Sequence, residues 1–487
     1  MTPRIITDNF PADAPHVPVA IVGAGACGLV AAITLRDADI DCVVLERDAA
    51  PQGSTALSSG FIPAAGTRAQ RTAGVQDSPE LFAQDIQNKA HGTAAAHLVK
   101  AFSEVIGPAI DTLSAQHAIE FIVLDGFLYP GHSVRRMHTV PDKTGASLVT
   151  QLERAANNAG ATLLCNSTVR QLWVSASDDC AAMSGDRVNQ AGQRIIGIGY
   201  IQPDGSLHHL SCDALILACN GFGGNPQMVR DLLPEMRDAP FAGHAGNDGS
   251  AIGWGRALGA RLADLGGYQG HGSWAVPQGA LISWALMMEG GIQVNAHGQR
   301  FHDETLGYSE AAVQVLAQPG GVAWDVFDEP ILQLARNFPD FCTAEAAGAV
   351  KQFDTVQNMA AWIGCDATHL VAACAIFTGV SGQNASENSK NLPAQHIFKR
   401  DLAAPYYAVK VTGALFHTQG GLDIDADCRV LREDGASFPN LLAAGGAARG
   451  VSGNAVWGYL SGNGLLSAVA GGTIAAKTAI KQVEKRL

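Results

Sequence analysis

The chain has 487 residues and a formal net charge of −13 at pH 7, and this length exceeds what one hydrophobic core supports. The acidic balance, together with the lack of a basic stripe, argues against a nucleic-acid partner. Glycine and polar residues interrupt the apolar stretches too often for a membrane span. We therefore expect two or three domains and no membrane segment.

The ten cysteines form no C-x-x-C motif, which excludes the common local signals for iron–sulfur, c-type haem and structural zinc sites. The first eighteen residues contain neither an apolar core of signal-peptide length nor a twin arginine. We therefore predict no metal site and a reduced, cytoplasmic location.

Residues 19–48 carry the strongest local signal. The apolar strand Val19–Val22 enters the glycine turn 23–28, a helix is expected from Leu29 to about Asp37, and a second strand, Cys42–Leu45, ends on Glu46. A G-x-G-x-x-G turn with a strand before it, a helix after it and an acid at the next strand end is typical of dinucleotide binding. The helix N-terminus then faces the phosphates, and Glu46 suits an unphosphorylated ribose.

The next elements repeat the pattern of strand, glycine loop and helix. A helix over 145–159 leads to a strand at 161–165, and 185–210 reads as strands joined by a Pro203-Asp204-Gly205 turn. A buried strand at 214–218 enters a second glycine-rich loop, and a helix follows Gly249.

Composition changes after Gly266. The stretch 267–398 mixes a strand at 291–294 with short helices around 309–316 and 327–336, and a strand begins at 405–411. Residues 440–446 again run from strand into glycine loop, and a closing helix starts near Gly462. Glycine loops near both ends predict one α/β, Rossmann-like nucleotide-binding domain built from 1–266 and 399–487, with 267–398 inserted as an α+β cap.

Several motifs are similar, in the same order, to those of the FAD-dependent fumarate reductase and 3-ketosteroid dehydrogenase superfamily. A serine/threonine-rich loop stands at 53–60, and Ala218–Asn225 resembles A-T-G-G-F-G-G-N. Residues 246–249 resemble T-G-D-G, His417–Leu422 matches H-T-x-G-G-L, and Leu441–Gly446 resembles L-x-A-A-G-E. The resemblance covers nearly the whole chain and implies an FAD-binding oxidoreductase.

The resemblance also implies which residues contact FAD. Ser54 replaces the histidine of covalent-flavin members, so the cofactor is expected to be non-covalent, and Gly446 replaces an acid. The expected FAD-binding residues are Gly23, Gly25, Ala26, Cys27, Gly28, Glu46, Arg47, Ser54, Thr55, Ser58, Ser59, Gly60, Val169, Ala218, Cys219, Asn220, Gly221, Asn225, Asp248, Gly445, Gly446, Gly462, Asn463, Leu465 and Leu466. No second dinucleotide motif offers a nicotinamide site, so electrons are expected to pass to a quinone, a carrier protein or oxygen.

Two family positions decide the expected chemistry. Where fumarate reductases carry a proton-donating and a carboxylate-clamping arginine, this chain has Tyr308 and Tyr459. Arginine's planar fork grips carboxylates, so the tyrosines resemble the ketosteroid dehydrogenase branch instead. That resemblance implies that Tyr308 removes a proton α to a ketone, that Tyr459 hydrogen-bonds the ketone oxygen, and that a hydride leaves for flavin N5.

The role of His417 stays open between a substrate hydrogen-bond donor and a brace for its turn. Each tyrosine taken singly is also compatible with a core residue. We expect a dehydrogenase that forms a C=C bond α,β to a ketone, on a small-molecule substrate such as a cyclic ketone or oxo-acid. The short insert favours a small ring over a full steroid. Reduction of an activated alkene or unsaturated carboxylate, and a non-catalytic FAD-binding electron-transfer subunit, are the alternatives.

Other clusters receive weaker interpretations. His302, Asp303 and Glu304 are consecutive on an expected strand and therefore point to opposite faces, which argues against a shared metal. Arg135, Arg136 and His138 are expected in a solvated loop rather than at a substrate anion. Four aromatic residues are candidates for the pocket wall or the core: Phe127, Tyr129, Trp274 and Trp284.

Overall fold

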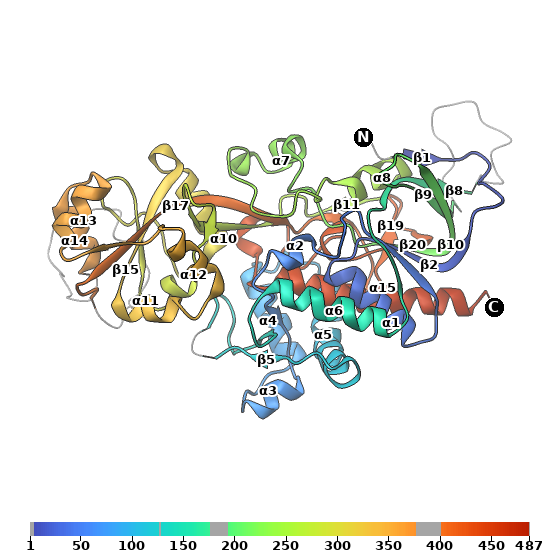
Figure 1. The fold of residues 1–487 in the computed structure, drawn as a ribbon, viewed down its shortest axis with the longest axis horizontal. Helices are drawn as coiled ribbons and strands as arrows, with labels where there is room; N and C mark the ends of the chain where they lie inside the picture. Colours follow the sequence, from blue (N-terminus) through green and yellow to red (C-terminus); the bar gives the residue numbers. More distant parts are fainter. Residues whose placement is uncertain (1–3, 126–127, 176–192, 376–400, 487) are drawn as a thin grey trace.

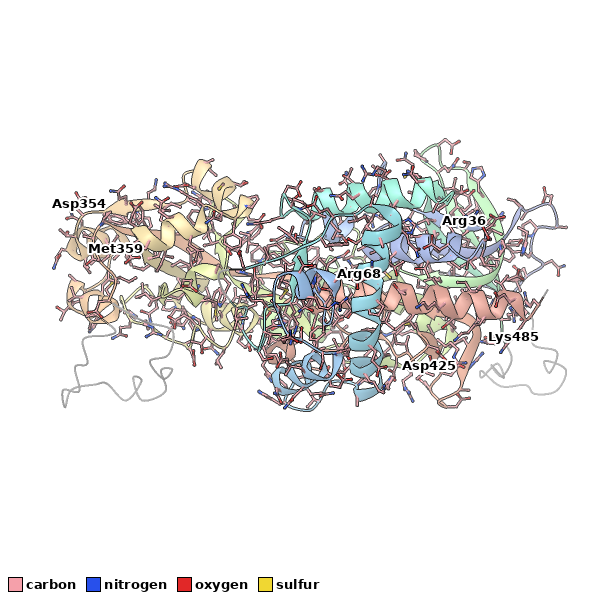
Figure 2. All side chains as sticks on the ribbon, turned by 90° about the horizontal axis from the view of Figure 1, so that it is seen from below. Arg36, Arg68, Asp354, Met359, Asp425 and Lys485 are labelled. Atoms are coloured by element: carbon pink, nitrogen blue, oxygen red, sulfur yellow. The ribbon has the colours of Figure 1, made fainter. Side chains whose placement is uncertain are left out.

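The computed structural model describes residues 4–125, 128–175, 193–375 and 401–486. Two lobes follow one another along the long axis (Figure 1). Figure 2, which views the molecule from below, places Asp354 and Met359 at the end of one lobe and Lys485 at the opposite end of the molecule.

The first lobe is built on a large sheet that has nine strands in the described part of the chain. Its path runs in the order β1, β8, β9, β10, β2, β3, β7, with β20 on β10 and β19 on β20. The strands are β1 (Arg4–Ile6), β2 (His16–Val22), β3 (Cys42–Leu45), β7 (Thr162–Leu164), β8 (Thr168–Val174), β9 (Ile195–Ile201), β10 (Leu207–Leu217), β19 (Arg429–Leu431) and β20 (Ser437–Ala443). β10 pairs in parallel with β2 and β20, so elements from both ends of the chain share this sheet.

Helices α1 (Ala26–Arg36), α6 (Gly145–Asn158) and α15 (Asn463–Glu484) lie side by side against this sheet (Figure 1). β2 and α1 are apolar almost throughout and form one buried core with the inner face of α15. α6 buries only one face and begins where the Thr144 hydroxyl accepts from the N–H of Ser147, a stabilising N-cap. The same lobe contains α2 (Gly53–Ala56), which contacts α6, and α3 (Arg68–Thr72), α4 (Pro79–Lys89) and α5 (Ala96–His117), of which α4 contacts α5 and α5 contacts α15.

The second lobe contains a six-stranded sheet, counted over the described residues, in the order β13, β12, β17, β15, β14, with β16 on β17. Its strands are β12 (Tyr268–Ala275), β13 (Ala280–Leu281), β14 (Ile292–Val294), β15 (Val322–Asp328), β16 (Lys351–Phe353) and β17 (Tyr406–Thr418). A second core fills it, with helices α9 (Ala285–Met288), α10 (Tyr308–Leu316), α11 (Glu329–Ala335), α12 (Pro339–Ala346), α13 (Val356–Ile363) and α14 (Ala367–Cys374). β17 lies beyond residue 398 yet pairs with β12 and β15. The domain division at 266 and 398 stays a prediction.

Smaller elements complete the described fold. They are the three-stranded sheet of β4 (Ile62–Pro63), β5 (Ile122–Val123) and β6 (Met137–Thr139), the pair β11 (Leu262–Ala263) and β18 (Gly421–Leu422), and helices α7 (Pro226–Leu232) and α8 (Ser250–Leu258).

Most predicted elements coincide with observed ones, with three qualifications. The strand expected at 302–304 is wrong, because these residues lie in neither a strand nor a helix of the structure. The helix expected over 327–336 is wrong at its start, because Phe327 and Asp328 belong to β15 and pair with Tyr407 and Tyr406; the helix begins at Glu329. The predicted hairpin is present as β9 and β10, although part of the expected 185–210 stretch lies outside the described residues.

Candidate functional site

A large cavity opens at the carboxyl ends of β2, β3, β10 and β20 and extends to the second lobe. It encloses about 1950 Å³, open mouth included. Twenty-two of the predicted site residues line it: Gly23, Gly25, Ala26, Cys27, Glu46, Arg47, Ser54, Thr55, Ser58, Ser59, Val169, Ala218, Cys219, Asn220, Asp248, Tyr308, His417, Gly445, Gly446, Tyr459, Gly462 and Leu465.

The first glycine loop has the geometry that a phosphate needs. Gly23 adopts φ +105° and lies so close to Ala218 that a Cβ would stand 2.6 Å from its carbonyl oxygen. A Cβ on Gly25 would face the open cavity, with Thr55 Oγ1 as its nearest neighbour at 3.5 Å. Helix α1 begins directly behind, so the positive end of its dipole points at the cavity.

Glu46 ends β3 at the cavity wall. Its carboxylate accepts from the N–H of Ala24 at 2.8 Å and of Asp48 at 3.0 Å, which fixes both oxygens at the mouth of the glycine loop. Beside it, Asp248 Oδ2 lies 3.8 Å from Arg47 and 4.0 Å from Arg170. Among the described residues that line the cavity, these two are the arginines, and both belong to this end.

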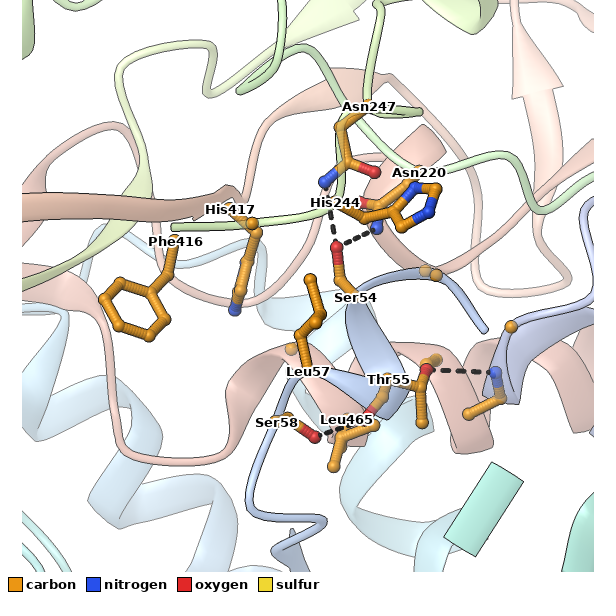
Figure 3. A pocket seen from close by; sticks show the side chains of 18 of the residues that line it. Ser54, Thr55, Leu57, Ser58, Asn220, His244, Asn247, Phe416, His417 and Leu465 are labelled. Atoms are coloured by element: carbon orange, nitrogen blue, oxygen red, sulfur yellow. Dashed lines mark hydrogen bonds between the residues drawn. The ribbon is translucent and has the colours of Figure 1, made fainter. Parts of the chain in front are cut away.

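The serine/threonine loop is tied to the second glycine loop. Ser54 Oγ accepts from the amide nitrogens of Asn220 at 3.0 Å and Asn247 at 2.9 Å, as Figure 3 shows. Thr55 Oγ1 accepts from the N–H of Ala26 at 3.1 Å. Between these contacts Leu57 projects into the cavity (Figure 3) and is 56% exposed.

These features fit FAD. Gly25 leaves room for a pyrophosphate, Glu46 lies where a ribose is expected, and Leu57 offers an uncovered apolar side chain to a flat ring. Burial raises the pKa of the Cys27 and Cys219 thiols to about 12, so both remain neutral thiols at this site.

The second end of the cavity is aromatic. Tyr308 is the first residue of α10, and Tyr459 precedes α15; both are buried, with ring centroids 6.1 Å apart. Burial raises the pKa of Tyr308 above its usual range, and hydrogen bonds from Ser461 and Tyr459 act in the opposite direction. Burial also raises the pKa of Tyr459, while backbone hydrogen bonds at Gly464 and Gly462 lower it.

His271 completes this aromatic wall. Its ring stacks on Tyr308 with centroids 4.8 Å apart and an interplanar angle of 17°, and it lies edge-on to Trp284. Nδ1 accepts from the N–H of Ser273 at 3.1 Å, so the neutral ring carries its proton on Nε2. Burial lowers the pKa of His271 to about 3.

His417 projects into the cavity beside Phe416 (Figure 3). It lies edge-on to Tyr459 with centroids 5.6 Å apart. A Cβ on Gly464 would stand 2.7 Å from His417 Nε2, so the ring lies directly against the N-terminus of α15. Burial lowers the pKa of His417 to about 4, which leaves the imidazole neutral near pH 7.

One contact joins the two lobes at the cavity. Ser59 donates its hydroxyl to Asp340 Oδ2 at 2.8 Å, and Asp340 belongs to α12 in the second lobe. Burial raises the pKa of Asp340, against the lowering effect of the Ser59 hydrogen bond.

Six predicted residues lie outside the cavity lining: Gly28, Gly60, Gly221, Asn225, Asn463 and Leu466. Gly28 packs α1 onto its own loop, since a Cβ there would stand 1.9 Å from the Gly23 carbonyl oxygen. Asn225 caps α7 by accepting from the N–H of Met228. These residues shape the loops behind the cavity.

The sequence analysis missed His271, Gln269 and Asp340 as lining residues. Gln269 and His271 alternate on one face of β12, and Gln269 is opposite His417 in β17, so only strand alternation offered a signal. Asp340 lies in no recognisable motif, so no sequence signal pointed to it. Of the aromatic candidates, Tyr129 and Trp284 line the cavity and Trp274 does not; Phe127 lies outside the described residues.

The expected solvated loop around Arg136 and His138 is wrong. Arg136 is 1% exposed, and its guanidinium pairs with Asp77 at 3.0 Å and with Asp85 at 2.5 Å. His138 is also buried and contacts Thr67 Oγ1 at 2.7 Å. Ion pairing and hydrogen bonding satisfy these groups and permit their burial.

The His302–Glu304 cluster is structural. His302 contacts Gln293 Oε1 at 2.7 Å, and Glu304 pairs with Arg300. Within the described residues, no group of three or more metal-ligating side chains converges on one point, and no helix is long and apolar enough to cross a membrane.

Two known proteins are similar in sequence to most of this chain. The NADH:fumarate oxidoreductase of Klebsiella pneumoniae is 26% identical over 466 residues, which are 95% of this chain and 48% of that protein. The 4-oxocyclohex-2-ene-1-carboxylate 5-dehydrogenase of Sinomonas cyclohexanicum is 23% identical over 91% of this chain and 90% of that enzyme. The chain thus spans about half the length of the Klebsiella relative.

The solved structure of 3-ketosteroid-Δ4-(5α)-dehydrogenase from Rhodococcus jostii has the same fold. It superposes with a TM-score of 0.71 at 23% identity, over 98% of this chain and 99% of that one. The model of the family described as "FAD binding domain" matches residues 18–465. The chain therefore belongs to this family of FAD-binding proteins.

Proposed function

We propose that the protein is an FAD-dependent dehydrogenase that forms a C=C bond α,β to a ketone, most suitably a ring ketone or oxo-acid. The observation that carries the proposal is the pair Tyr308 and Tyr459, which face each other at the aromatic end of the cavity. The lining arginines lie at the opposite end, beside Asp248. The aromatic end of the cavity therefore presents phenol groups to a substrate. A site for a dicarboxylate would instead favour an arginine, whose guanidinium binds a carboxylate through two hydrogen bonds.

Tyr308 is the proposed base. As a phenolate it takes the α-proton of the ketone on its oxygen, and the C–H electron pair becomes part of the new C=C bond. Burial raises the pKa of Tyr308, and hydrogen bonds from Ser461 and Tyr459 oppose that shift, so Tyr308 is a neutral phenol near pH 7 and the reactive phenolate fraction grows toward alkaline pH. Bound FAD supplies the acceptor for the hydride that the β-carbon loses. The proton and hydride together account for the two hydrogens removed.

Tyr459 is the proposed carbonyl donor. A hydrogen bond to the ketone oxygen stabilises the negative charge that develops there when the α-proton leaves, and such stabilisation is often the largest catalytic effect. The rings of His271, Trp284 and Phe416 lie around this part of the cavity, and such apolar surroundings strengthen a hydrogen bond. The Sinomonas relative, named for a dehydrogenation next to a ring ketone, supports this reading.

The reverse reaction is the second candidate. The Klebsiella relative is named as an NADH:fumarate oxidoreductase, and the His417–Leu422 motif is intact here. His417 would then donate a hydrogen bond to a carbonyl or carboxylate oxygen of the alkene.

Anaerobic mixing of the purified FAD-bound protein with substrates separates these functions. Cyclohexanone and 4-oxocyclohexanecarboxylate are the saturated probes, and loss of oxidised-flavin absorbance supports the dehydrogenase. Reoxidation of pre-reduced protein by an enone or fumarate, without bleaching by either ketone, identifies a reductase. No reaction in either direction identifies a non-catalytic FAD-binding subunit.

The Tyr308→Phe variant tests the base. We expect it to keep its FAD and to lose bleaching by about 10²–10⁴-fold, the usual contribution of general base catalysis. Full activity in this variant would rule out Tyr308 as the base.

A further inference from the structure

A row of three buried polar side chains runs behind His417. Asn463, the first residue of α15, donates its amide N–H to Ser452 Oγ at 2.9 Å. Ser452 donates its hydroxyl to Gln419 Oε1 at 2.9 Å, and Gln419 Nε2 lies 3.1 Å from His417 Nδ1. Ser452 and Asn463 are fully buried, and Gln419 is 4% exposed.

The hydrogen bonds of this row all run from donor to acceptor toward His417, because the role of each side chain fixes the role of the next. Once Asn463 donates to Ser452 Oγ, the serine hydrogen is available for Gln419 Oε1. That contact turns the amide N–H₂ of Gln419 toward His417, where a donor requires a lone pair on Nδ1. A neutral imidazole with a lone pair on Nδ1 carries its proton on Nε2.

A second contact of His417 Nδ1 would require the opposite tautomer, with the proton on Nδ1. The Thr418 carbonyl oxygen lies 3.4 Å from Nδ1 and would need a proton there. This distance exceeds the usual 2.7–3.2 Å of an N–H···O bond, whereas the Gln419 contact lies within it. The shorter contact, anchored by Ser452 and Asn463, is the stronger one.

We propose that Gln419, held by Ser452 and Asn463, is a positioning residue that fixes His417 as the Nε2–H tautomer, a neutral hydrogen-bond donor to a substrate oxygen. This inference rests on the proposed function only for the identity of that oxygen. His417 and Gly464 line the cavity together, so the proton on Nε2 is presented where the substrate is expected.

Hydrogen bonds, and not neighbouring charges, determine which tautomer of His417 is stable. The titratable side chain packed against it is Tyr459, with Tyr308 next along, and both are neutral phenols near pH 7 because burial raises their pKa. The flanking elements are β12, which contributes Gln269 opposite His417, and the N-terminus of α15. Charge therefore does not select which nitrogen is protonated.

The test is ¹⁵N NMR of the FAD-bound protein labelled at histidine, with His417→Asn to assign the signal. We expect a neutral Nε2–H ring for His417 at pH 7. In Gln419→Glu, a carboxylate accepts from Nδ1, so we expect the proton to move to Nδ1 and the pKa of His417 to rise from its value of about 4. Ser452→Ala releases the Gln419 amide and should give a mixture of tautomers.

The activity measurement is separate. In Gln419→Glu we expect ketone-dependent bleaching to weaken by at least tenfold while oxidised-flavin absorbance, which reports the folded holoprotein, is retained. Gln151→Glu, an exchange of the same kind at a glutamine of α6 that contacts Ser147, is the matched control and should leave both unchanged.

A wild-type His417 with its proton on Nδ1, or an unaltered tautomer in Gln419→Glu, would overturn the inference. The outcome can also separate the two proposals. If His417 is the Nε2–H tautomer but no ketone reduces the flavin and no alkene reoxidises it, the proposed function is refuted and the positioning role of Gln419 stands.

Discussion

Tyr308 and Tyr459 lie edge to face, with ring centroids 6.1 Å apart, although one begins a helix of the second lobe and the other precedes the last helix of the chain. Tyr459 hydrogen-bonds Tyr308 in a way that favours the Tyr308 phenolate. Tyr459 has one hydroxyl proton, so it supports the Tyr308 phenolate before the substrate binds. When Tyr459 donates to the ketone oxygen instead, Ser461 is the side chain that still hydrogen-bonds Tyr308.

Replacing Tyr459 with phenylalanine tests this coupling. Because burial raises the pKa of Tyr308, bleaching by a saturated ketone should speed up toward alkaline pH. In Tyr459→Phe we expect that rise to move to still higher pH, since one phenolate-stabilising hydrogen bond is lost. At pH 7 the rate should fall by about 10²–10³-fold, as for loss of an oxyanion donor.

Stopped-flow absorbance across pH provides the measurement. Tyr200→Phe, a tyrosine of β9 that stacks on His208, is the control and should keep the wild-type profile. An unshifted profile in Tyr459→Phe would show that the two phenols are not coupled.

Ser54 is expected to contribute to FAD affinity. Its oxygen accepts from Asn220 and Asn247, so Ser54→Ala leaves two amides without that partner in a partly buried site. The cost of an unsatisfied buried group is about 1–3 kcal/mol, which corresponds to a Kd for FAD that is higher by about 5–150-fold. Titration of the apoprotein with FAD measures it. Thr34→Ala, whose hydroxyl donates to the Val30 carbonyl within α1, should leave the Kd unchanged.

The FAD is expected to leave the protein on denaturation. Ser54 stands where covalent members carry a histidine, and it offers a hydroxyl that already accepts two hydrogen bonds. Acid precipitation should therefore release all the yellow colour into the supernatant. A pellet that keeps its flavin after washing would contradict non-covalent binding.

Acid should destabilise the protein through buried histidines. Burial lowers the pKa of His132 and His271 to about 3 and of His417 to about 4, against about 6.5 for an unfolded histidine. The unfolded state therefore binds more protons below about pH 6.5, and stability falls as pH decreases from there toward 4. Each group contributes a slope of up to about 1.4 kcal/mol per pH unit.

His132→Gln removes one of these three groups. Its ring donates from Nε2 to the Ser461 carbonyl oxygen at 3.0 Å, and a glutamine amide preserves a donor there. Thermal unfolding at several pH values should show a shallower loss of Tm between pH 6.5 and 4 than in the wild type. An identical slope would mean that His132 is protonated in the folded state.

Local sequence predicted the nucleotide half of this site well. The apolar run of β2, the glycines of the loop and the acid that follows β3 lie within some thirty residues. Each property is local: the positive φ of Gly23, the missing Cβ of Gly28 and the strand end before Glu46. The same holds for the Thr144-capped helix α6. The start of α11 was misjudged because Phe327 is fixed in β15 by a long-range partner, Tyr407.

The aromatic half of the cavity depends on tertiary structure. The sequence placed Tyr308, His417 and Tyr459 at family positions, but their mutual distances come from packing α10, β17 and the loop before α15 around one cavity. His271 joins them because strand pairing brings β12 beside β17, and Asp340 joins because α12 meets the loop at Ser59. The sequence alone determined a dinucleotide-binding strand–loop–helix unit, since that unit depends on backbone geometry and short-range periodicity. Only the tertiary structure decided which rings, amides and carboxyls surround the substrate end, because those contacts join segments that no local pattern relates.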